Sequence, residues 1–370
     1  MNTHKPLGYE HNLSESKLLN AAFNQDQSCF AICHESGFRV YNTDPMELRM
    51  KRNFSSSRQN SGIGLITMLY RTNYVALVGG GKQPRYPVNK LCIWDDLKKR
   101  PSMFLEFMSP ILNALMTRIR IIVVLRNQVL VHAFESRPRL LGSYETYDND
   151  NGACDLSINE RNSILAFPSR SVGQIQLVDI SPGNQDRNLI SIIKAHRAKI
   201  QSLCMSNLGN MVASASETGT LIRIHDTANC ALMFEFRRGL DKAIVTSMKF
   251  SPDDSKLAVL SDKNTLHVYS LRERLGMEGI DSGKNQAHFL KGFPMMPKYF
   301  KSTWSFASKD VGRREDLVND FGVIGWSDNE SIIILWKMKG IWEKYVMVDT
   351  MGDQGRKWEI VREGWRRLYE

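Results

Sequence analysis

The chain has 370 residues, of which 42% are hydrophobic and 24% charged, which is the composition of a folded globular protein and excludes a disordered one. Its 49 Lys and Arg residues against 39 Asp and Glu residues give a formal net charge of +10. This balance favours an acidic partner: a nucleic acid, an anionic membrane or a phosphorylated lipid. The N-terminus lacks the apolar core of a secretory signal, and no apolar run reaches the roughly 18–20 residues that span a bilayer. We therefore expect a soluble, cytoplasmic protein, and any membrane contact should be peripheral.

Short β-rich segments recur along the chain in the pattern strand, turn, strand, turn, strand. The first copy is Leu18–Phe23, Cys29–Cys33 and Gly37–Tyr41. The pattern returns near Leu65–Asp95, Ile111–Ala133, Cys154–Val178, Ile200–His225, Val245–Tyr269 and Phe321–Trp336. The spacing is roughly 45 residues, the blade period of WD-type propellers.

Two adjacent copies are the clearest. Met211–Ser216 and Leu221–Asp226 flank a polar turn, and Lys256–Ser261 and Leu266–Tyr269 flank another. Seven such units predict an all-β, seven-bladed WD40-type β-propeller, because a closed ring protects the sheet edges that isolated hairpins would expose. A two-sheet sandwich would explain the short strands but not the repeat.

The repeat assigns residues 1–350 to one propeller, with a long blade-6 loop at residues 272–298. Residues 351–370 are mixed in charge and partly aromatic, and the pattern gives them no place; they could pack on the propeller. The six cysteines lack paired C-x-x-C spacing, so we expect buried thiols in a reduced compartment, no metal and no cofactor. No Ser/His/Asp or paired-carboxylate arrangement stands out, which predicts a non-enzymatic protein.

One segment carries recognition chemistry: Phe236-Arg237-Arg238-Gly239, between two blades. Neighbouring side chains of an extended strand point to opposite sides, so Arg237 and Arg238 are predicted to serve two pockets, one beside each adjoining blade. The planar fork of arginine holds two phosphate oxygens at once. Small hydroxyls and basic residues flank the pair on both sides. The same residues also fit a solvated arginine pair beside ordinary hairpin turns, and spacing alone leaves both interpretations open.

The run from Lys194 to Leu271 resembles the PROPPIN family, the WIPI-like propellers that bind phosphatidylinositol 3-phosphate and phosphatidylinositol 3,5-bisphosphate. The resemblance lies in Ala195-His196, Ala213–Arg223, Phe236–Gly239 and Ser261–His267, and also in Ala76–Gly81 and Ile93–Asp96. Locally the chain is most similar to the fungal branch with a short propeller, whose members act in autophagy.

The resemblance implies two phosphoinositide sites by position. The first would consist of His196, Ser216, Thr220, Arg223 and Arg237, and the second of Arg238, Ser261, Thr265 and His267. Two positions depart from the family pattern. Asn264 stands where many relatives have glycine, in a turn that asparagine tolerates. Lys242 stands where arginine is frequent, so the charge is kept but the fork is lost.

The blade-6 loop ends in an apolar run that could enter a membrane. Phe289, Leu290, Phe293, Met295 and Met296 are spaced by lysines, as suits a lipid interface. An apolar loop end packed on its own propeller fits the sequence equally well. The resemblance implies the membrane-inserting role.

The resemblance therefore implies a phosphoinositide effector that is peripheral on vacuolar, endosomal and preautophagosomal membranes. It would act in autophagy, including micronucleophagy, and in vacuolar and endosomal trafficking. Protein partners from autophagy would contact the blade-2 loops Ser55–Ser61 and Lys82–Asn89, and we expect a monomer that binds no nucleic acid. Two alternatives remain: a WD scaffold that binds only proteins, and a nucleic-acid binder.

Overall fold

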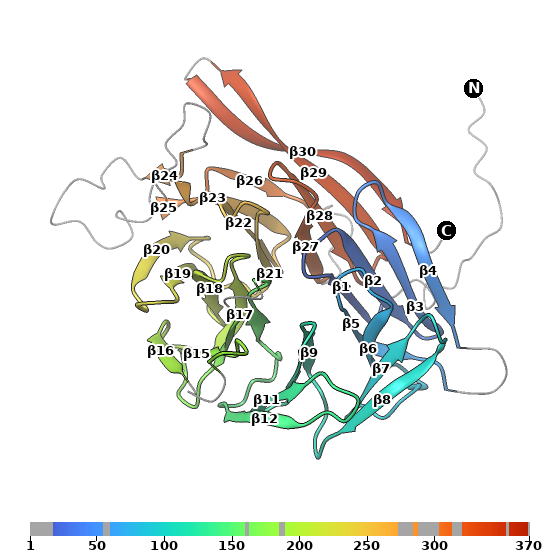
Figure 1. The fold of residues 1–370 in the computed structure, drawn as a ribbon. Coiled ribbons are helices and arrows are strands. Elements are labelled where there is room, and N and C mark those ends of the chain that lie inside the picture. Colours follow the sequence, from blue (N-terminus) through green and yellow to red (C-terminus); the bar gives the residue numbers. More distant parts are fainter. Residues whose placement is uncertain are drawn as a thin grey trace, which may run out of the picture.

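The computed structural model describes residues 18–54, 60–159, 163–184, 189–272, 284–287, 303–312, 320–352 and 355–368. In these residues the chain forms seven antiparallel blades around a central axis (Figure 1). The predicted seven-bladed, all-β propeller is confirmed. Within the same residues, no helix has the length and apolarity needed to cross a membrane.

Each of blades 1 to 4 consists of four consecutive strands. Blade 1 contains β1 (Asn20–Phe23), β2 (Cys29–His34), β3 (Gly37–Asn42) and β4 (Glu47–Asn53). Blade 2 contains β5 (Ile63–Met68), β6 (Tyr74–Gly79), β7 (Lys90–Asp95) and β8 (Arg100–Glu106). Blade 3 contains β9 (Asn113–Met116), β10 (Arg120–Val124), β11 (Gln128–Ala133) and β12 (Leu140–Glu145). Blade 4 contains β13 (Asp155–Leu156), β14 (Ile164–Pro168), β15 (Gln174–Asp179) and β16 (Ile190–Lys194).

The last three blades carry two additions, an extra strand pair and a long hairpin. Blade 5 contains β17 (Ile200–Met205), β18 (Met211–Ser216), β19 (Leu221–Asp226) and β20 (Leu232–Arg237), extended by β25 (Thr303–Trp304) and β24 (Gln286–Ala287). Blade 6 contains β21 (Val245–Phe250), β22 (Lys256–Ser261), β23 (Thr265–Ser270) and β26 (Ala307–Asp310). Blade 7 contains β27 (Gly322–Trp326), β28 (Ser331–Trp336), β29 (Ile341–Gly352) and β30 (Gly355–Arg367).

Every blade thus has a fourth, outer strand that the three-strand sequence pattern did not reveal. The inner strands β18, β22 and β28 are buried along their whole length. The outer strands β4 and β8 are largely exposed or alternate between exposed and half-buried residues. An outer strand is partly exposed to solvent, so it can contain polar residues. Its sequence therefore shows less of the apolar pattern that identifies a strand.

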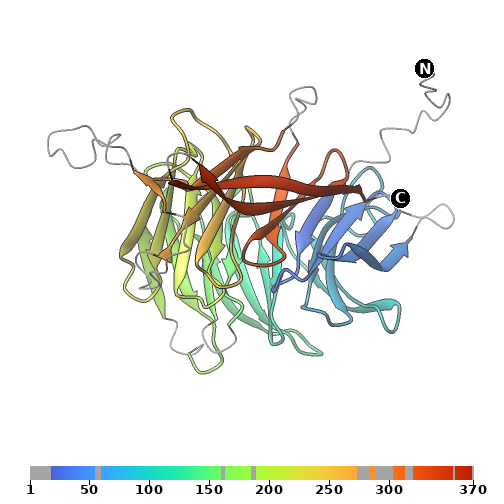
Figure 2. The ribbon, with the colours of Figure 1, turned by 90° about the horizontal axis from the view of Figure 1, so that it is seen from above.

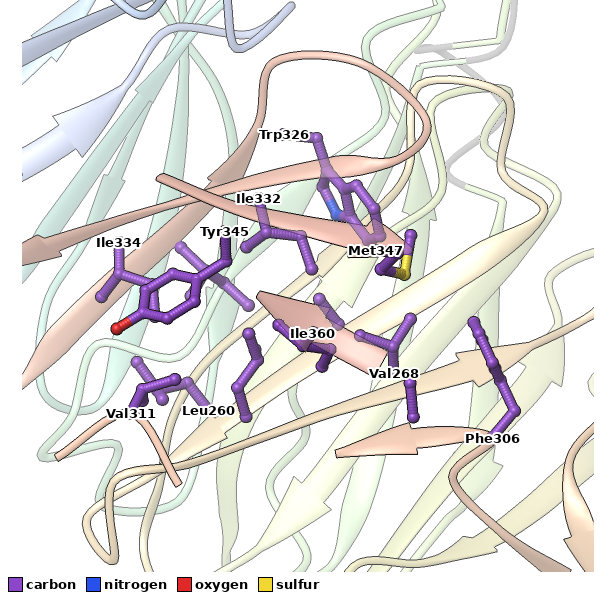
Figure 3. Packing of buried hydrophobic residues seen from close by; sticks show 14 of the residues in the cluster. Leu260, Val268, Phe306, Val311, Trp326, Ile332, Ile334, Tyr345, Met347 and Ile360 are labelled. Atoms are coloured by element: carbon purple, nitrogen blue, oxygen red, sulfur yellow. The ribbon is translucent and has the colours of Figure 1, made fainter. Parts of the chain in front are cut away.

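The hydrophobic core is divided into clusters that lie between neighbouring blades. Alternate residues of one strand serve opposite interfaces, as in β22, where Leu257 and Val259 pack towards blade 5 while Ala258 and Leu260 pack towards blade 7. Figure 3 shows the cluster between blades 6 and 7, in which Leu260 and Val268 contact residues of the last blade, including Ile334. Each blade is therefore stabilised by both neighbours.

The ring closes without a strand shared between its first and last blades. Blade 7 ends the chain and blade 1 begins it, and the two meet through side chains and a few backbone groups. Leu368 is fully buried between them, and its carbonyl oxygen accepts a hydrogen bond of 2.6 Å from the Tyr41 hydroxyl. The Leu18 N–H donates to the Lys337 carbonyl at 2.8 Å, and Lys344 pairs with Asp44 at 2.7 Å.

The turn between β1 and β2 ties the inner ends of several blades together. Gln25 Nε2 donates to the carbonyl oxygens of Met68 in blade 2 and Met116 in blade 3, at 2.8 and 3.0 Å. Gln27 is buried, and its Oε1 accepts from the Trp326 N–H of blade 7 at 2.8 Å. Blade 1 therefore contacts distant blades as well as its two neighbours.

The segment 355–368, which the sequence pattern could not place, forms β30 and the closing residue Leu368. Strands β29 and β30 are 12 and 13 residues long, and their hairpin extends past blade 7 alongside the outer strand of blade 6 (Figure 2). There the ring of Trp358 meets that of Phe306 edge-on, with centroids 6.1 Å apart.

The closing contact predicts a specific loss of stability. Leu368→Ala should lower the free energy of unfolding by about 2–5 kcal/mol, because it leaves a cavity between blades 7 and 1. Leu97→Ala is the matched control, since Leu97 is 80% exposed, and it should change stability by less than about 0.5 kcal/mol. Urea midpoints measure both variants, and equal midpoints for them would contradict this account of closure.

Buried histidines predict a pH dependence of stability. Burial, with help from nearby Arg39 and Lys51, lowers the pKa of His34 to about 4, and burial beside Arg223 lowers that of His225 to about 4. The unfolded chain, with histidine pKa values near ~6.5, binds more protons between these limits, so stability should fall as the pH drops from about 6.5 towards 4.

Urea midpoints at pH 7 and pH 5 test this, with a His34→Gln, His225→Gln double variant as the comparison. The variant should lose less stability than the wild type between the two pH values. Asp254 and Asp320 have pKa values raised by burial and act in the opposite sense in both proteins, so the difference isolates the histidines. Equal losses would show that these rings titrate normally.

Candidate functional site

The predicted site residues lie on blades 5 and 6 and on the connections that enter and leave blade 5. In the first set, Ser216 ends β18, Thr220 precedes β19, and Arg237 ends β20, while Arg223 lies within β19 and His196 follows β16 of blade 4. In the second set, Arg238 follows β20, Ser261 ends β22, and Thr265 and His267 lie on β23. In both blades a serine at the end of the second strand precedes a threonine by four residues.

In the first set, Arg223 and His196 are already held by protein groups. Arg223 lies opposite Glu235 in the β19–β20 ladder, and its Nε donates to the Glu235 carboxylate at 2.8 Å. Its Nη1 contacts the Ala195 carbonyl, next to His196. His196 Nε2 lies 2.9 Å from the hydroxyl of Ser214, which is fully buried. The strand register thus brings together a guanidinium, a carboxylate and an imidazole.

Each blade has a serine–threonine hydroxyl pair after its second strand, but the partner differs: Ser216 pairs with Thr218 and not with the predicted Thr220, whereas Ser261 pairs with the predicted Thr265. Ser216 Oγ lies 2.9 Å from Thr218 Oγ1, and Ser261 Oγ lies 3.0 Å from Thr265 Oγ1. A hydroxyl can rotate its hydrogen towards a new acceptor, so each pair can donate to an anion. Asn264 has a φ of 54°, which confirms that this position needs the left-handed conformation that asparagine tolerates.

Arg238 is 6% exposed and joins two turns. Its Nε donates to the Gly219 carbonyl at 2.7 Å, and its Nη2 contacts the Asp241 carbonyl. Burial lowers its pKa, against the effect of Tyr269, Asp262 and Asp241 nearby. Gly219 has a φ of 61° and lies so close to the Ala243 carbonyl that a Cβ would come within 1.7 Å of it, so only glycine fits this turn.

Arg237 differs from its neighbour in its surroundings. It is half-buried, pairs with Leu221 in the β20 ladder, and its carbonyl oxygen accepts a hydrogen bond of 3.1 Å from the Tyr269 hydroxyl of blade 6. Adjacent arginines thus have unlike environments: Arg238 is buried in the turn that leads to blade 6, and Arg237 ends the outer strand of blade 5.

The two candidate histidines are both neutral at physiological pH. Burial, with the charge of Arg223 next, lowers the pKa of His196 to about 4. Burial followed by the charge of Arg238 does the same for His267. A neutral imidazole donates through one nitrogen and accepts through the other. Which nitrogen faces an anion therefore depends on the hydrogen bond at the opposite side of the ring.

Sequence reasoning missed a residue that the fold brings to the second set, Ser305. Its hydroxyl lies 3.1 Å from His267 Nδ1, although the two residues are 38 positions apart and the blade-6 loop lies between them. No local spacing could reveal this contact. Glu235 was also missed, but its place opposite Arg223 follows once the strand register is known.

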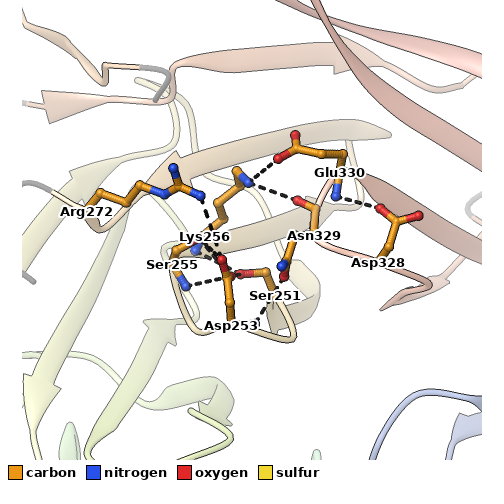
Figure 4. Close-up of polar contacts among 8 residues, drawn as sticks. All are labelled: Ser251, Asp253, Ser255, Lys256, Arg272, Asp328, Asn329 and Glu330. Atoms are coloured by element: carbon orange, nitrogen blue, oxygen red, sulfur yellow. Dashed lines mark hydrogen bonds and ion pairs between the residues drawn. The ribbon is translucent and has the colours of Figure 1, made fainter. Parts of the chain in front are cut away.

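The base of the long loop is anchored on blade 6. Arg272, where the loop begins, lies 3.8 Å from Asp253, which belongs to the polar network drawn in Figure 4 together with Lys256, Asn329 and Glu330. On the return path, Asn285 exchanges two hydrogen bonds with the backbone of Ser270. The apolar residues Phe289, Leu290, Phe293, Met295 and Met296 lie outside the described residues.

The end of the loop joins the sheet of blade 5. Strand β25 pairs in parallel with β20, so that Thr303 lies beside Phe236 and Trp304 beside Arg237. Strand β24 pairs with β25 in turn. The chain therefore returns from the loop beside the backbone of Phe236 and Arg237 before it enters blade 6.

The family profile, the related sequences and the solved structures that match this chain agree with one another. The profile of the PROPPIN family matches residues 17–296. "SVP1-like protein 2" of Pichia angusta is 65% identical over 370 residues, covering 100% of both chains. The solved structure of Kluyveromyces lactis Hsv2 has a TM-score of 0.77 at 25% identity and covers 95% of this chain and 99% of its own. KlAtg21 in complex with the coiled coil of AgAtg16 has a TM-score of 0.71 at 23% identity, with coverage of 95% and 99%, which shows a likeness of fold.

The profile match over most of the chain and the full-length relative agree with the resemblance seen in the arginine segment. This chain belongs to the PROPPIN family, the non-enzymatic β-propellers that bind phosphoinositides.

Proposed function

We propose that the chain binds phosphatidylinositol 3-phosphate and phosphatidylinositol 3,5-bisphosphate at two sites, one on each side of the arginine pair. The observation that supports this most directly is that similar groups gather on each side of the arginine pair. Each side has neighbouring serine and threonine hydroxyls, a neutral histidine and one of two consecutive arginines, although the first hydroxyl pair is Ser216–Thr218 and His196 comes from the connection between blades 4 and 5. Together these groups can donate several hydrogen bonds to a phosphate without steric bulk.

In the first site, a bound phosphate would replace a contact that Arg223 now makes within the protein. Glu235, whose side chain is 43% exposed, holds Arg223. A phosphate that displaced this carboxylate would gain the guanidinium fork, and Glu235 could turn to water. Arg237 is the second cation of the site. The neutral His196 adds one donor and the hydroxyls of Ser216 and Thr220 add two more.

In the second site, Arg238 has a different role from that of the arginines in the first site. Its bonds to the carbonyls of Gly219 and Asp241 hold the turn beside the hydroxyl pair of Ser261 and Thr265. Its charge lies close enough to lower the pKa of His267. We therefore assign Arg238 a fixed positive charge at the back of the pocket, while His267 and the two hydroxyls donate directly.

Membrane attachment needs more than head-group recognition, because a single weak signal gives only marginal binding. We propose that the apolar run Phe289–Met296 enters the bilayer while the two sites hold head groups. Once one of these contacts has formed, it holds the others close to the membrane, so that the affinities of the loop and of the two sites reinforce one another. The +10 net charge adds a salt-sensitive attraction to anionic lipid.

The same proposal places the protein on vacuolar, endosomal and preautophagosomal membranes, as a monomer that recruits autophagy proteins. The complex of KlAtg21 with the coiled coil of AgAtg16 supports a protein partner for a propeller of this shape. Our candidate surface is the blade-2 loop Lys82–Asn89. The Glu35 carboxylate accepts from the Lys82 N–H at 3.0 Å, while the Lys82 and Val88 side chains remain exposed.

The two-site proposal predicts the stoichiometry of head-group binding. By calorimetry with soluble inositol 1,3-bisphosphate, the wild type should bind two molecules, Arg237→Thr one, Arg238→Thr one, and the double variant none. Arg139→Thr is the matched control, because Arg139 is 71% exposed on blade 3 and should leave both sites intact. Unfolding midpoints verify that each variant is folded.

Undiminished binding by the folded double variant would overturn the site assignment. A liposome panel of phosphoinositide isomers at two salt concentrations separates the alternatives. A nucleic-acid binder would lose affinity for any polyanion as salt rises and would show no isomer preference. A protein-only scaffold would bind none of the liposomes.

The membrane role of the loop predicts a separation of two affinities. A variant with Phe289, Leu290, Phe293 and Met296 changed to Ser should bind soluble head group like the wild type, because the pockets are untouched. It should lose most of its affinity for liposomes, measured by co-sedimentation. Leu97→Ser with Met108→Ser is the control, since these side chains are fully or largely exposed on blade 2 and its exit. Liposome binding equal to wild type would exclude the loop as an anchor.

A further inference from the structure

The return segment of the blade-6 loop contacts both candidate sites within four residues. Trp304 pairs with Arg237 of the first site through the β25–β20 ladder. Ser305 places its hydroxyl 3.1 Å from His267 Nδ1 of the second. No local pattern marked Ser305, and the fold brings it to the histidine from the far end of the long loop.

Both neighbours hold Ser305 in place. The Trp304 backbone belongs to a strand pair, and the Phe306 N–H donates to the Val268 carbonyl at 3.1 Å. The Phe306 side chain is 5% exposed and packs in the core beside Val268, as Figure 3 shows, with Trp358 of the long hairpin against its ring. Since the residues on each side are fixed, the Ser305 hydroxyl has a defined position.

The geometry admits either direction for this hydrogen bond, and burial favours one of them. Ser305 is 7% exposed, and His267 Nδ1 is the hydrogen-bond partner that the described part of the chain gives its Oγ. A buried hydroxyl hydrogen needs an acceptor, which favours donation from Ser305 to Nδ1. In that direction the hydrogen of the neutral ring lies on Nε2.

His196 offers a contrast. Its partner Ser214 has a second acceptor, the Arg223 carbonyl at 3.4 Å, so that hydroxyl can either donate to the ring or accept from it. The hydrogen bond of His196 therefore favours neither tautomer, whereas that of His267 favours the one with its hydrogen on Nε2.

We propose that Ser305 is a positioning residue of the second head-group site. Its hydroxyl donates to His267 Nδ1 and keeps the ring hydrogen on Nε2, from which the imidazole donates to a phosphate oxygen of the inositol head group. The inference rests on the proposed function, because it assigns the ligand of Nε2. It adds that the blade-6 loop supplies part of the recognition chemistry as well as the membrane contact.

The test uses the full chain carrying Arg237→Thr, so that only the second site binds. Ser305→Ala should weaken binding of inositol 1,3-bisphosphate about five- to tenfold, the loss of one well-placed hydrogen bond. Ser305→Thr keeps the hydroxyl and should restore it. Ser308→Ala is the matched control, because Ser308 lies opposite His267 in the β23–β26 ladder but is exposed, and it should bind like its parent.

A spectroscopic reading separates orientation from general damage. Imidazole ¹⁵N shifts, assigned with His267→Gln, should show the Nε2–H tautomer in the parent and a mixture in Ser305→Ala. Unchanged shifts and affinity in Ser305→Ala would overturn this inference while leaving the two-site function intact. If the Arg237→Thr parent showed no binding of inositol 1,3-bisphosphate, the proposed function would be overturned instead. The assignment of a phosphate ligand to Nε2 would then fall as well.

Discussion

Closure of the ring between blades 7 and 1 is the constraint on which the rest of the structure depends. Every blade keeps four strands of its own, so no strand from one end of the chain completes the sheet of the other. The two blades are held by a hydrophobic cluster around Leu368, by the hydrogen bond from Tyr41 and by the Lys344–Asp44 ion pair. Because each blade buries both faces against neighbours, a gap at one interface would expose apolar surface on two blades.

The candidate sites lie on blades 5 and 6, of which blade 6 packs on the last blade, and two contacts hold a long insertion there. The insertion begins at Arg272, which is held by Asp253, and it returns through a strand added to blade 5. The returning strand lies beside Arg237, whereas the Arg272–Asp253 contact lies at the other end of β22 and β23. In the proposed function, the short return segment would join membrane contact to head-group recognition, which is the geometry that lets weak contributions act together.

Burial sets the chemistry of these sites. The histidines are neutral because their environment disfavours a charge, and the nearby arginines add to this effect. In the proposed sites, a neutral ring would donate only one hydrogen to a phosphate, so its orientation would matter more than its charge. The fixed positive charge comes from the arginines, whose guanidinium groups stay protonated even when burial lowers their pKa.

The fold and the arginine motif could be read from the amino-acid sequence. The strands Met211–Ser216 and Lys256–Ser261 are wholly buried and consist mostly of small or apolar residues, and their regular recurrence made the blade repeat visible. The arginine pair and the hydroxyl spacing are local features, so they were visible as well. Outer strands such as β4 were not, because one exposed face removes the apolar pattern.

The contacts between residues far apart in the sequence follow from the assembled fold. Ser305 reaches His267 because β25 and β26 bring the chain back to blade 6, and Glu235 reaches Arg223 through a strand register. The C-terminal segment had no readable place because it alternates charged and aromatic residues. It is fixed by pairing with β29 and by one buried leucine between the first and last blades. Such contacts depend on the whole ring being assembled, and no local pattern of residues encodes them.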